Sequence, residues 1–234
     1  MPRARIRPPV FEIGLKGYCW GADAVRLAVE ADRLAEALGV SIVFNPQTVD
    51  IRPVAQATRR ILVFAQHMDP VEPGRGVGGV LAEALRDAGA VGTLLNHSEK
   101  PVTLGALART IERAQAVGLF TLVFADSPAE AAALACLGPD IVLAEPPELI
   151  ATGVSAGNVM ADFVAATVAA VKAVDPAVLV MSGAGVNGPD DVDRMIRLGL
   201  DGTGSSSGIL RAADPAAAMR AMLEAEARAW HATH

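Results

Sequence analysis

Residues 104–128 read LGALARTIERAQAVGLFTLVFADSP, which contains one complete passage from helix to strand to helix. Apolar residues in its first half share one face of a predicted helix: Leu104, Leu107, Ile111 and Ala114. Gly118 follows at the place of a helix C-cap. The apolar run 119–124 is short enough for a strand buried on both faces, and Ser127-Pro128 is typical of a helix start. The stretch therefore predicts a buried strand between two helices.

The same alternation recurs along the whole chain. Short apolar runs bounded by Gly, Pro, Asp or Asn predict strands at 10–16, 42–44, 61–65, 92–95, 119–124, 141–144, 178–181 and 199–205. A regular alternation of strands and helices implies a parallel sheet, and eight such units in 234 residues fit one closed (β/α)₈ barrel, a single domain over residues 1–234. An open doubly wound sheet is the alternative, but no G-x-G-x-x-G follows the first strand.

Composition excludes several classes of protein. No apolar run approaches the roughly 18 residues of a transmembrane helix, and no apolar segment typical of a signal peptide follows the basic N-terminus. A net charge of −6 argues against nonspecific nucleic-acid binding. Cys19 and Cys136 have no metal-site or disulfide spacing, so we expect two buried thiols in a reducing cytoplasm. Because aromatic residues make up only 4%, we also expect an aliphatic core.

Polar residues follow several of the predicted strands. In a barrel of this kind the active site lies at the carboxyl ends of the strands. Lys16, His97 and Glu145 follow the first, fourth and sixth strands, and they supply a cation, an imidazole and a carboxylate. Gly- and Ser-rich loops at 182–185 and 205–208 follow the last two strands, where such barrels hold phosphate groups. Each residue alone is more often structural or solvated, but their convergence on one face favours a site.

Two segments resemble motifs of a known family. LLNHSE at 94–99 and EPPELIATG at 145–153 are similar to the catalytic histidine loop and the mobile lid of the triosephosphate isomerases, most of all the short archaeal type. The similarity extends from Phe11 to about Pro215 and includes AQH at 65–67 and GAG at 183–185. This resemblance implies a TIM barrel that isomerises a small sugar phosphate.

The resemblance also implies catalytic roles. Glu145 would be the general base, and His97 would be a neutral imidazole that donates to the substrate oxygens and is kept neutral by the following helix N-terminus. Lys16 would place positive charge near the phosphate and the developing oxyanion. Asn96 and Glu99 would support the histidine loop. An enediol mechanism of this type requires no metal ion and no organic cofactor.

Substrate binding and assembly follow from the same resemblance. Residues expected to contact the substrate and its phosphate are Ala151, Gly183, Gly185, Ser206 and Ser207. The lid, 147–153, would close over the phosphate and exclude water. The long loop at 66–80 would contact a neighbouring subunit, so we expect a homo-oligomer, either a dimer or a tetramer.

Three positions depart from the family pattern. Gly14 stands where the family has a substrate-contacting Asn two residues before the lysine, and we expect it to leave space there. Val77 replaces a Thr of the inter-subunit loop, and Ala151 replaces a lid Gly. Three functions therefore stay open. The chain could isomerise glyceraldehyde 3-phosphate and dihydroxyacetone phosphate, it could act on a related tetrose phosphate, or it could be a weakly active paralogue that binds a phosphorylated ligand or a protein partner.

Overall fold

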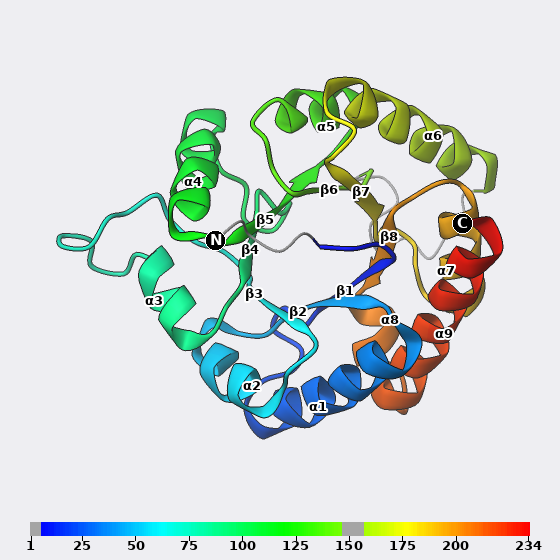
Figure 1. Ribbon diagram of the computed structural model, residues 1–234, viewed down its shortest axis with the longest axis horizontal. Helices are drawn as coiled ribbons and strands as arrows, with labels where there is room; N and C mark the ends of the chain where they lie inside the picture. The colour runs from blue at the N-terminus through cyan, green and yellow to red at the C-terminus, as the bar shows by residue number, and fades with distance from the viewer. Residues whose placement is uncertain (1–5, 147–156) are drawn as a thin grey trace.

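The computed structural model describes residues 6–146 and 157–234, and in it eight parallel strands close into a barrel (Figure 1). The strands are β1 (Val10–Gly14), β2 (Ser41–Asn45), β3 (Leu62–Ala65), β4 (Gly92–Leu95), β5 (Phe120–Ala125), β6 (Ile141–Ala144), β7 (Leu179–Ser182) and β8 (Gly202–Ser205). Because β1 pairs with both β2 and β8, the sheet has no free edge. The predicted (β/α)₈ barrel is confirmed.

Helices form an outer ring around the strands (Figure 1). They are α1 (Gly21–Leu38), the short 3₁₀ helix η1 (Thr48–Asp50), α2 (Ile51–Ala57), α3 (Ala82–Ala88), α4 (Leu104–Val117), α5 (Pro128–Ala135), α6 (Gly157–Val174), α7 (Pro189–Arg197), α8 (Ser207–Leu210) and α9 (Pro215–Thr233). Thr103, Ser127 and Asp214 cap α4, α5 and α9, each accepting a backbone N–H with its side chain. Gly118 ends α4 in the left-handed conformation, as predicted. Leu104, by contrast, is 63% exposed in the first turn of α4.

Two predicted strands are shorter than expected. β1 ends at Gly14, and Lys16 lies beyond it with a positive φ of 44° that no strand residue adopts. β8 begins at Gly202, because Gly199 terminates α7 with a φ of 96°. Apolar composition alone does not distinguish a strand from the turns at its ends.

The barrel separates two hydrophobic clusters. Phe11, Ile13 and Leu15 pack outward against the helices, whereas Val10 belongs to the cluster inside the barrel. Because side chains alternate along a strand, Glu12 and Gly14 face inward with Val10.

Aromatic rings occupy the barrel interior. Phe64, Phe120 and Phe124 belong to the inner cluster, and the rings of Phe64 and Phe120 stack with centroids 6.5 Å apart. The expectation of an aliphatic core is therefore wrong for the interior. Gly92 explains how the rings fit, since a Cβ there would collide with Phe64.

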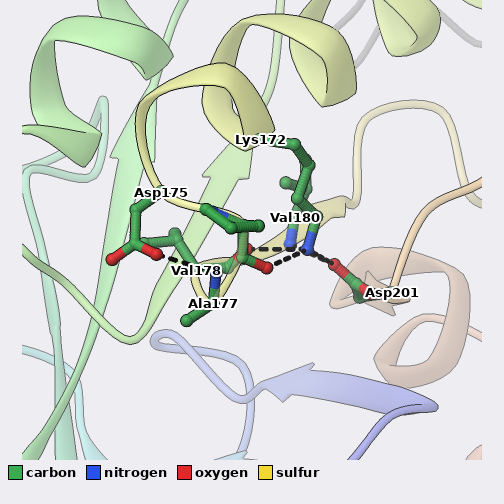
Figure 2. Close-up of polar contacts among 7 residues, drawn as sticks. Lys172, Asp175, Ala177, Val178, Val180 and Asp201 are labelled. Atoms are coloured by element: carbon green, nitrogen blue, oxygen red, sulfur yellow. Dashed lines mark hydrogen bonds and ion pairs between the residues drawn. The ribbon is translucent and has the colours of Figure 1, made fainter.

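Polar contacts join α6 to the amino ends of β7 and β8 (Figure 2). Lys172 Nζ lies 2.8 Å from Asp201 Oδ2 and donates to the Val178 carbonyl at 2.9 Å. The same Asp201 oxygen accepts the backbone N–H of Val180 at 2.8 Å. This network lies at the end of the barrel opposite the carboxyl ends of the strands. It therefore attaches α6 to the sheet and does not contact the residues at the carboxyl ends.

Both cysteines are more exposed than the sequence predicts. The expectation that both thiols are buried is wrong, because Cys19 is half-buried and Cys136, at the end of α5, is exposed. Over residues 6–146 and 157–234, no helix combines the length and the apolar character needed to cross a membrane.

Candidate active site

A cavity of about 560 Å³ opens at the carboxyl ends of the strands. It brings together nearly all the predicted site residues, and those that line it are Lys16, His97, Glu99, Glu145, Gly183, Gly185, Ser206 and Ser207. Ala151 and the predicted lid, 147–153, lie outside the described residues. No cluster of three or more His, Cys, Asp or Glu suited to a metal ion occurs in the described part of the chain.

Lys16 is held in a strained turn after β1. Its positive φ is unusual for a residue with a side chain. Its carbonyl accepts the side-chain amides of Gln47, at 2.5 Å, and Gln66, at 3.1 Å. Its ammonium nitrogen lies 2.6 Å from Glu99 Oε1. Both glutamines follow other strands, β2 and β3, so this support for Lys16 depends on closure of the barrel.

His97 is held as a neutral imidazole. The backbone N–H of Glu99 donates to its Nδ1 at 3.0 Å, and because a backbone amide can only donate, the ring proton lies on Nε2. Burial and then the charge of Lys16 lower the pKa of His97. The Phe124 ring meets the imidazole edge-on at 4.5 Å. Helix α4 begins at Leu104 and not directly after His97, and the contact that the structure shows at Nδ1 is the Glu99 amide.

Asn96 shapes the loop that carries His97. It adopts a φ of 60°, which Asn tolerates better than most residues. Its side-chain nitrogen donates to the Phe124 carbonyl at 3.1 Å, and its side-chain oxygen accepts from Val102 N–H at 3.2 Å. These two contacts tie the loop to β5 and to the approach to α4.

Glu145 follows β6 directly, and its backbone N–H donates to Ala125 at 2.9 Å. Burial raises the pKa of Glu145 to about 7, while the nearby Lys16 opposes the shift. Gly183 makes room for the carboxyl, because a Cβ there would lie 2.9 Å from Glu145 Oε1. A carboxyl with a pKa near neutrality can both take and return a proton at physiological pH.

The two Gly- and Ser-rich loops meet at the cavity, beyond the ends of β7 and β8. Ser205 Oγ donates to the Val186 carbonyl at 2.9 Å, which joins the loop after β8 to the loop after β7. Gly185 has a φ of 74°, and Ser206 and Ser207 stand at the beginning of α8. Backbone amides at a loop and a helix start of this kind suit an anionic oxygen.

Gly14 does not leave the expected space. A Cβ at this position would collide with Ser206 Oγ and would lie 2.9 Å from Glu12 Oε1. Glu12 is a buried carboxyl that lines the cavity floor, and the Asn45 side chain donates to it at 2.6 Å. Glu12 was not predicted as a site residue, although a Glu at an inward position of an otherwise apolar strand is a detectable signal.

Comparisons with known proteins agree with this geometry. The family model described as triosephosphate isomerase matches residues 15–224. A triosephosphate isomerase of Methanothermus fervidus is 36% identical over 217 residues, which cover 92% of this chain and 97% of that protein. One of Caldivirga maquilingensis is 41% identical over 211 residues, 89% of this chain and 93% of that protein. One of Pyrobaculum calidifontis is 41% identical over 212 residues, 90% of this chain and 92% of that protein.

The matched residues include Lys16, His97 and Glu145, which converge on the cavity. The chain therefore belongs to the triosephosphate isomerase family.

Proposed function

We propose that this chain is an aldose–ketose isomerase that interconverts glyceraldehyde 3-phosphate and dihydroxyacetone phosphate through an enediolate. The observation that carries the proposal is the convergence of Glu145, His97 and Lys16 on one cavity, with a carboxyl whose pKa is about 7 beside a neutral imidazole. Proton transfer between adjacent carbons needs a base that works in both directions near neutral pH.

In this mechanism Glu145 takes the proton from the carbon next to the carbonyl and returns it to the neighbouring carbon. His97 donates from Nε2 to the oxygens on those two carbons, which suits the tautomer set by the Glu99 amide. Lys16 stabilises the negative charge that develops on them. Glu99 in turn holds the Lys16 ammonium at 2.6 Å, and Asn96 holds the histidine loop.

The substrate phosphate would bind away from the base. Gly183, Gly185, Ser206 and Ser207 line the wall formed by the last two strands and their loops, and Ala151 would complete the grip from the lid. Because the whole reaction consists of proton transfers, we assign it no cofactor and no metal ion. The expected partner is a small phosphorylated sugar.

The proposed function is tested with the purified chain in a coupled assay on glyceraldehyde 3-phosphate. We expect turnover by the wild type, and we expect Glu145→Gln to lower kcat by about 10²- to 10⁴-fold, because the amide cannot accept the proton. Glu36→Gln, on the outer helix α1, is the matched control and should keep full activity. A wild-type chain without turnover would contradict the proposal.

The same assay separates the alternatives. The case for a tetrose phosphate depended on space at Gly14, and that space is occupied by Ser206 and Glu12. We therefore expect a higher kcat/KM for dihydroxyacetone phosphate than for a tetrulose phosphate. Binding of inorganic phosphate without turnover of any sugar phosphate would indicate a paralogue that only binds its ligand.

A further inference from the structure

Glu12 is an ionisable residue that lies in the floor of the proposed active site. Its side chain is 7% exposed and lines the cavity from β1, on the inward side of the strand. The proposed reaction assigns it no function, because proton transfer is the task of Glu145. Burying a carboxyl is costly unless other contacts compensate, so its position requires a physical explanation.

Glycines on the neighbouring strands make room for this carboxyl. A Cβ at Gly204 of β8 would lie 2.8 Å from Glu12 Oε2, and a Cβ at Gly183, just after β7, would lie 2.9 Å from Glu145 Oε1. The positions on β8 and just after β7 that adjoin these two carboxyls therefore carry no side chain. Glu12 and Glu145 both line the same cavity.

Asn45 completes the floor. Its side-chain nitrogen donates to Glu12 Oε1 at 2.6 Å. Its Oδ1 atom is fully buried and, within the part of the chain that the structure describes, has no hydrogen-bond partner. A buried acceptor without a donor is costly, and a ligand with a suitable O–H group removes that cost.

We propose that Glu12 and Asn45 form a hydroxyl-binding subsite of the isomerase, in which Asn45 Oδ1 accepts a substrate O–H and the Glu12 carboxylic acid donates to the same oxygen. This inference rests on the proposed function, since the hydroxyl belongs to the sugar phosphate. The two residues thereby become determinants of specificity, and they provide a polar contact that Gly14 cannot.

The charges around Glu12 support the donor state. Burial raises the pKa of Glu12 to about 7, the Asn45 hydrogen bond opposes the shift, and Glu145 reinforces it. Lys16 is the opposing cation, and it is already paired with Glu99. His97, the next titratable group on the cavity wall, is neutral and adds no charge. Once Glu145 is ionised as the base, a protonated Glu12 avoids a second negative charge beside the enediolate.

Two variants of Glu12 test the subsite. Glu12→Gln keeps the pattern of contacts at every pH, because its oxygen can accept from Asn45 while its N–H₂ donates to the substrate. We expect its kcat/KM to stay within about threefold of the wild type at pH 6, and the ratio of variant to wild type to rise above pH 7, where Glu12 loses its proton. Glu12→Val, which removes the donor, should lower kcat/KM by about 10- to 100-fold.

Matched controls separate the subsite from a merely structural function. Glu226→Gln changes another buried carboxyl, on α9 outside the cavity, and its kcat/KM ratio to wild type should not vary with pH at temperatures where it is folded. Glu12→Val should keep the inhibition constant of inorganic phosphate, because the anion would be held by backbone amides of the loops after β7 and β8, which a change of the Glu12 side chain leaves in place.

Three outcomes would overturn the proposal while the proposed function stands. The first is a ratio of Glu12→Gln to wild-type kcat/KM that stays constant from pH 6 to 9. The second is a folded Glu12→Val with kcat/KM within twofold of the wild type, and the third is a phosphate inhibition constant that changes together with kcat/KM in that variant. If Glu12→Val does not fold, the pH dependence of the ratio of Glu12→Gln to wild-type kcat/KM decides whether the subsite exists. A wild-type chain without isomerase activity would overturn the proposed function and the subsite together.

Discussion

Burial changes the acidity of Glu145 and His97 in opposite directions. Loss of water disfavours whichever form is charged, so it raises the pKa of the carboxyl to about 7 and lowers the pKa of the imidazole. Lys16 opposes the first shift and reinforces the second. One cavity therefore holds a base that can be ionised near pH 7 and a hydrogen-bond donor that stays neutral there.

His97 should be neutral, with its proton on Nε2, throughout the range from pH 6.5 to 9. The physical reason is the Glu99 N–H, which occupies Nδ1, together with burial of the ring. The ¹⁵N chemical shifts of the imidazole measure this directly, and His231 near the C-terminus provides an internal control that is exposed. An imidazolium signal for His97 at pH 7 would contradict the expectation.

At the scale of secondary-structure elements, buried or half-buried polar contacts attach the outer helices to the strands. Lys172 and Asp201 do so for α6 at the amino ends of β7 and β8 (Figure 2). Thr203 of β8 donates its hydroxyl to Glu226 of α9. Neither contact lies in the cavity, so both should affect stability and not the chemistry of the site.

Asp201→Ala should lower the free energy of unfolding by about 1–3 kcal/mol, because it leaves the Val180 N–H without its acceptor and the Lys172 ammonium without its carboxylate partner. Urea denaturation measures the loss, and kcat/KM should be unchanged. Asp193→Ala is the control, since it removes an exposed pair with Arg197 and should cost about 0.5 kcal/mol or less. Equal losses in the two variants would show that the network contributes no more than a surface pair.

Glu226 should make the fold less stable as the pH rises. Burial raises its pKa to about 8 in the folded protein, against an ordinary value of 4.5. Between these values the folded chain keeps a proton that the unfolded chain releases. The contribution of Glu226 to the free energy of unfolding is therefore largest below about pH 4.5 and decreases until about pH 8.

Glu226→Gln should remove this pH dependence, because the amide cannot ionise and can still accept from Thr203. Thermal denaturation from pH 5 to 8.5 measures the effect, and at the upper end we expect the variant Tm to exceed the wild-type Tm by roughly 5 °C. Parallel Tm–pH curves for the two proteins would show that Glu226 is not responsible.

At the scale of the whole molecule, the long loop between β3 and α3 projects away from the barrel (Figure 1). Its base is pinned by Asp69, which accepts the Val80 N–H at 2.8 Å and lies 3.1 Å from the His67 ring. Its tip is exposed, and Val77 in particular is fully open to solvent. The resemblance to the triosephosphate isomerases implies that this loop contacts a second subunit.

We expect a homo-oligomer in solution, a dimer or a tetramer with a mass that is a multiple of 24.1 kDa. Val77→Glu should weaken the association, since it would bury a charge in the contact. Sedimentation velocity at several concentrations measures the oligomeric state of the wild type and the strength of association in the variant. A wild-type chain that sediments only as a monomer would contradict the expectation, and Val174→Glu, on the outer helix α6, is the control.

The order and kind of the elements could be predicted because they depend on local patterns. Apolar runs between helix caps such as Ser127 and Gly118 identified the strand–helix units without reference to distant residues. His97 and Glu145 could be chosen as candidates because motifs around them resemble one family. The residues at which strands end could not be predicted from local patterns. The turn at Lys16, for example, is held by Gln47 and Gln66, which follow two other strands.

The sequence by itself therefore determined the eight-unit barrel, the end of it that bears the polar residues, and the identity of the principal candidates. Only the tertiary structure decided that Ser206 and Glu12 fill the space at Gly14, that Asn45 pairs with Glu12, and that the Glu99 amide sets the His97 tautomer. The physical reason is that periodicity and capping are local properties of the chain, whereas burial, pKa and hydrogen bonding depend on neighbours that closure of the barrel brings together.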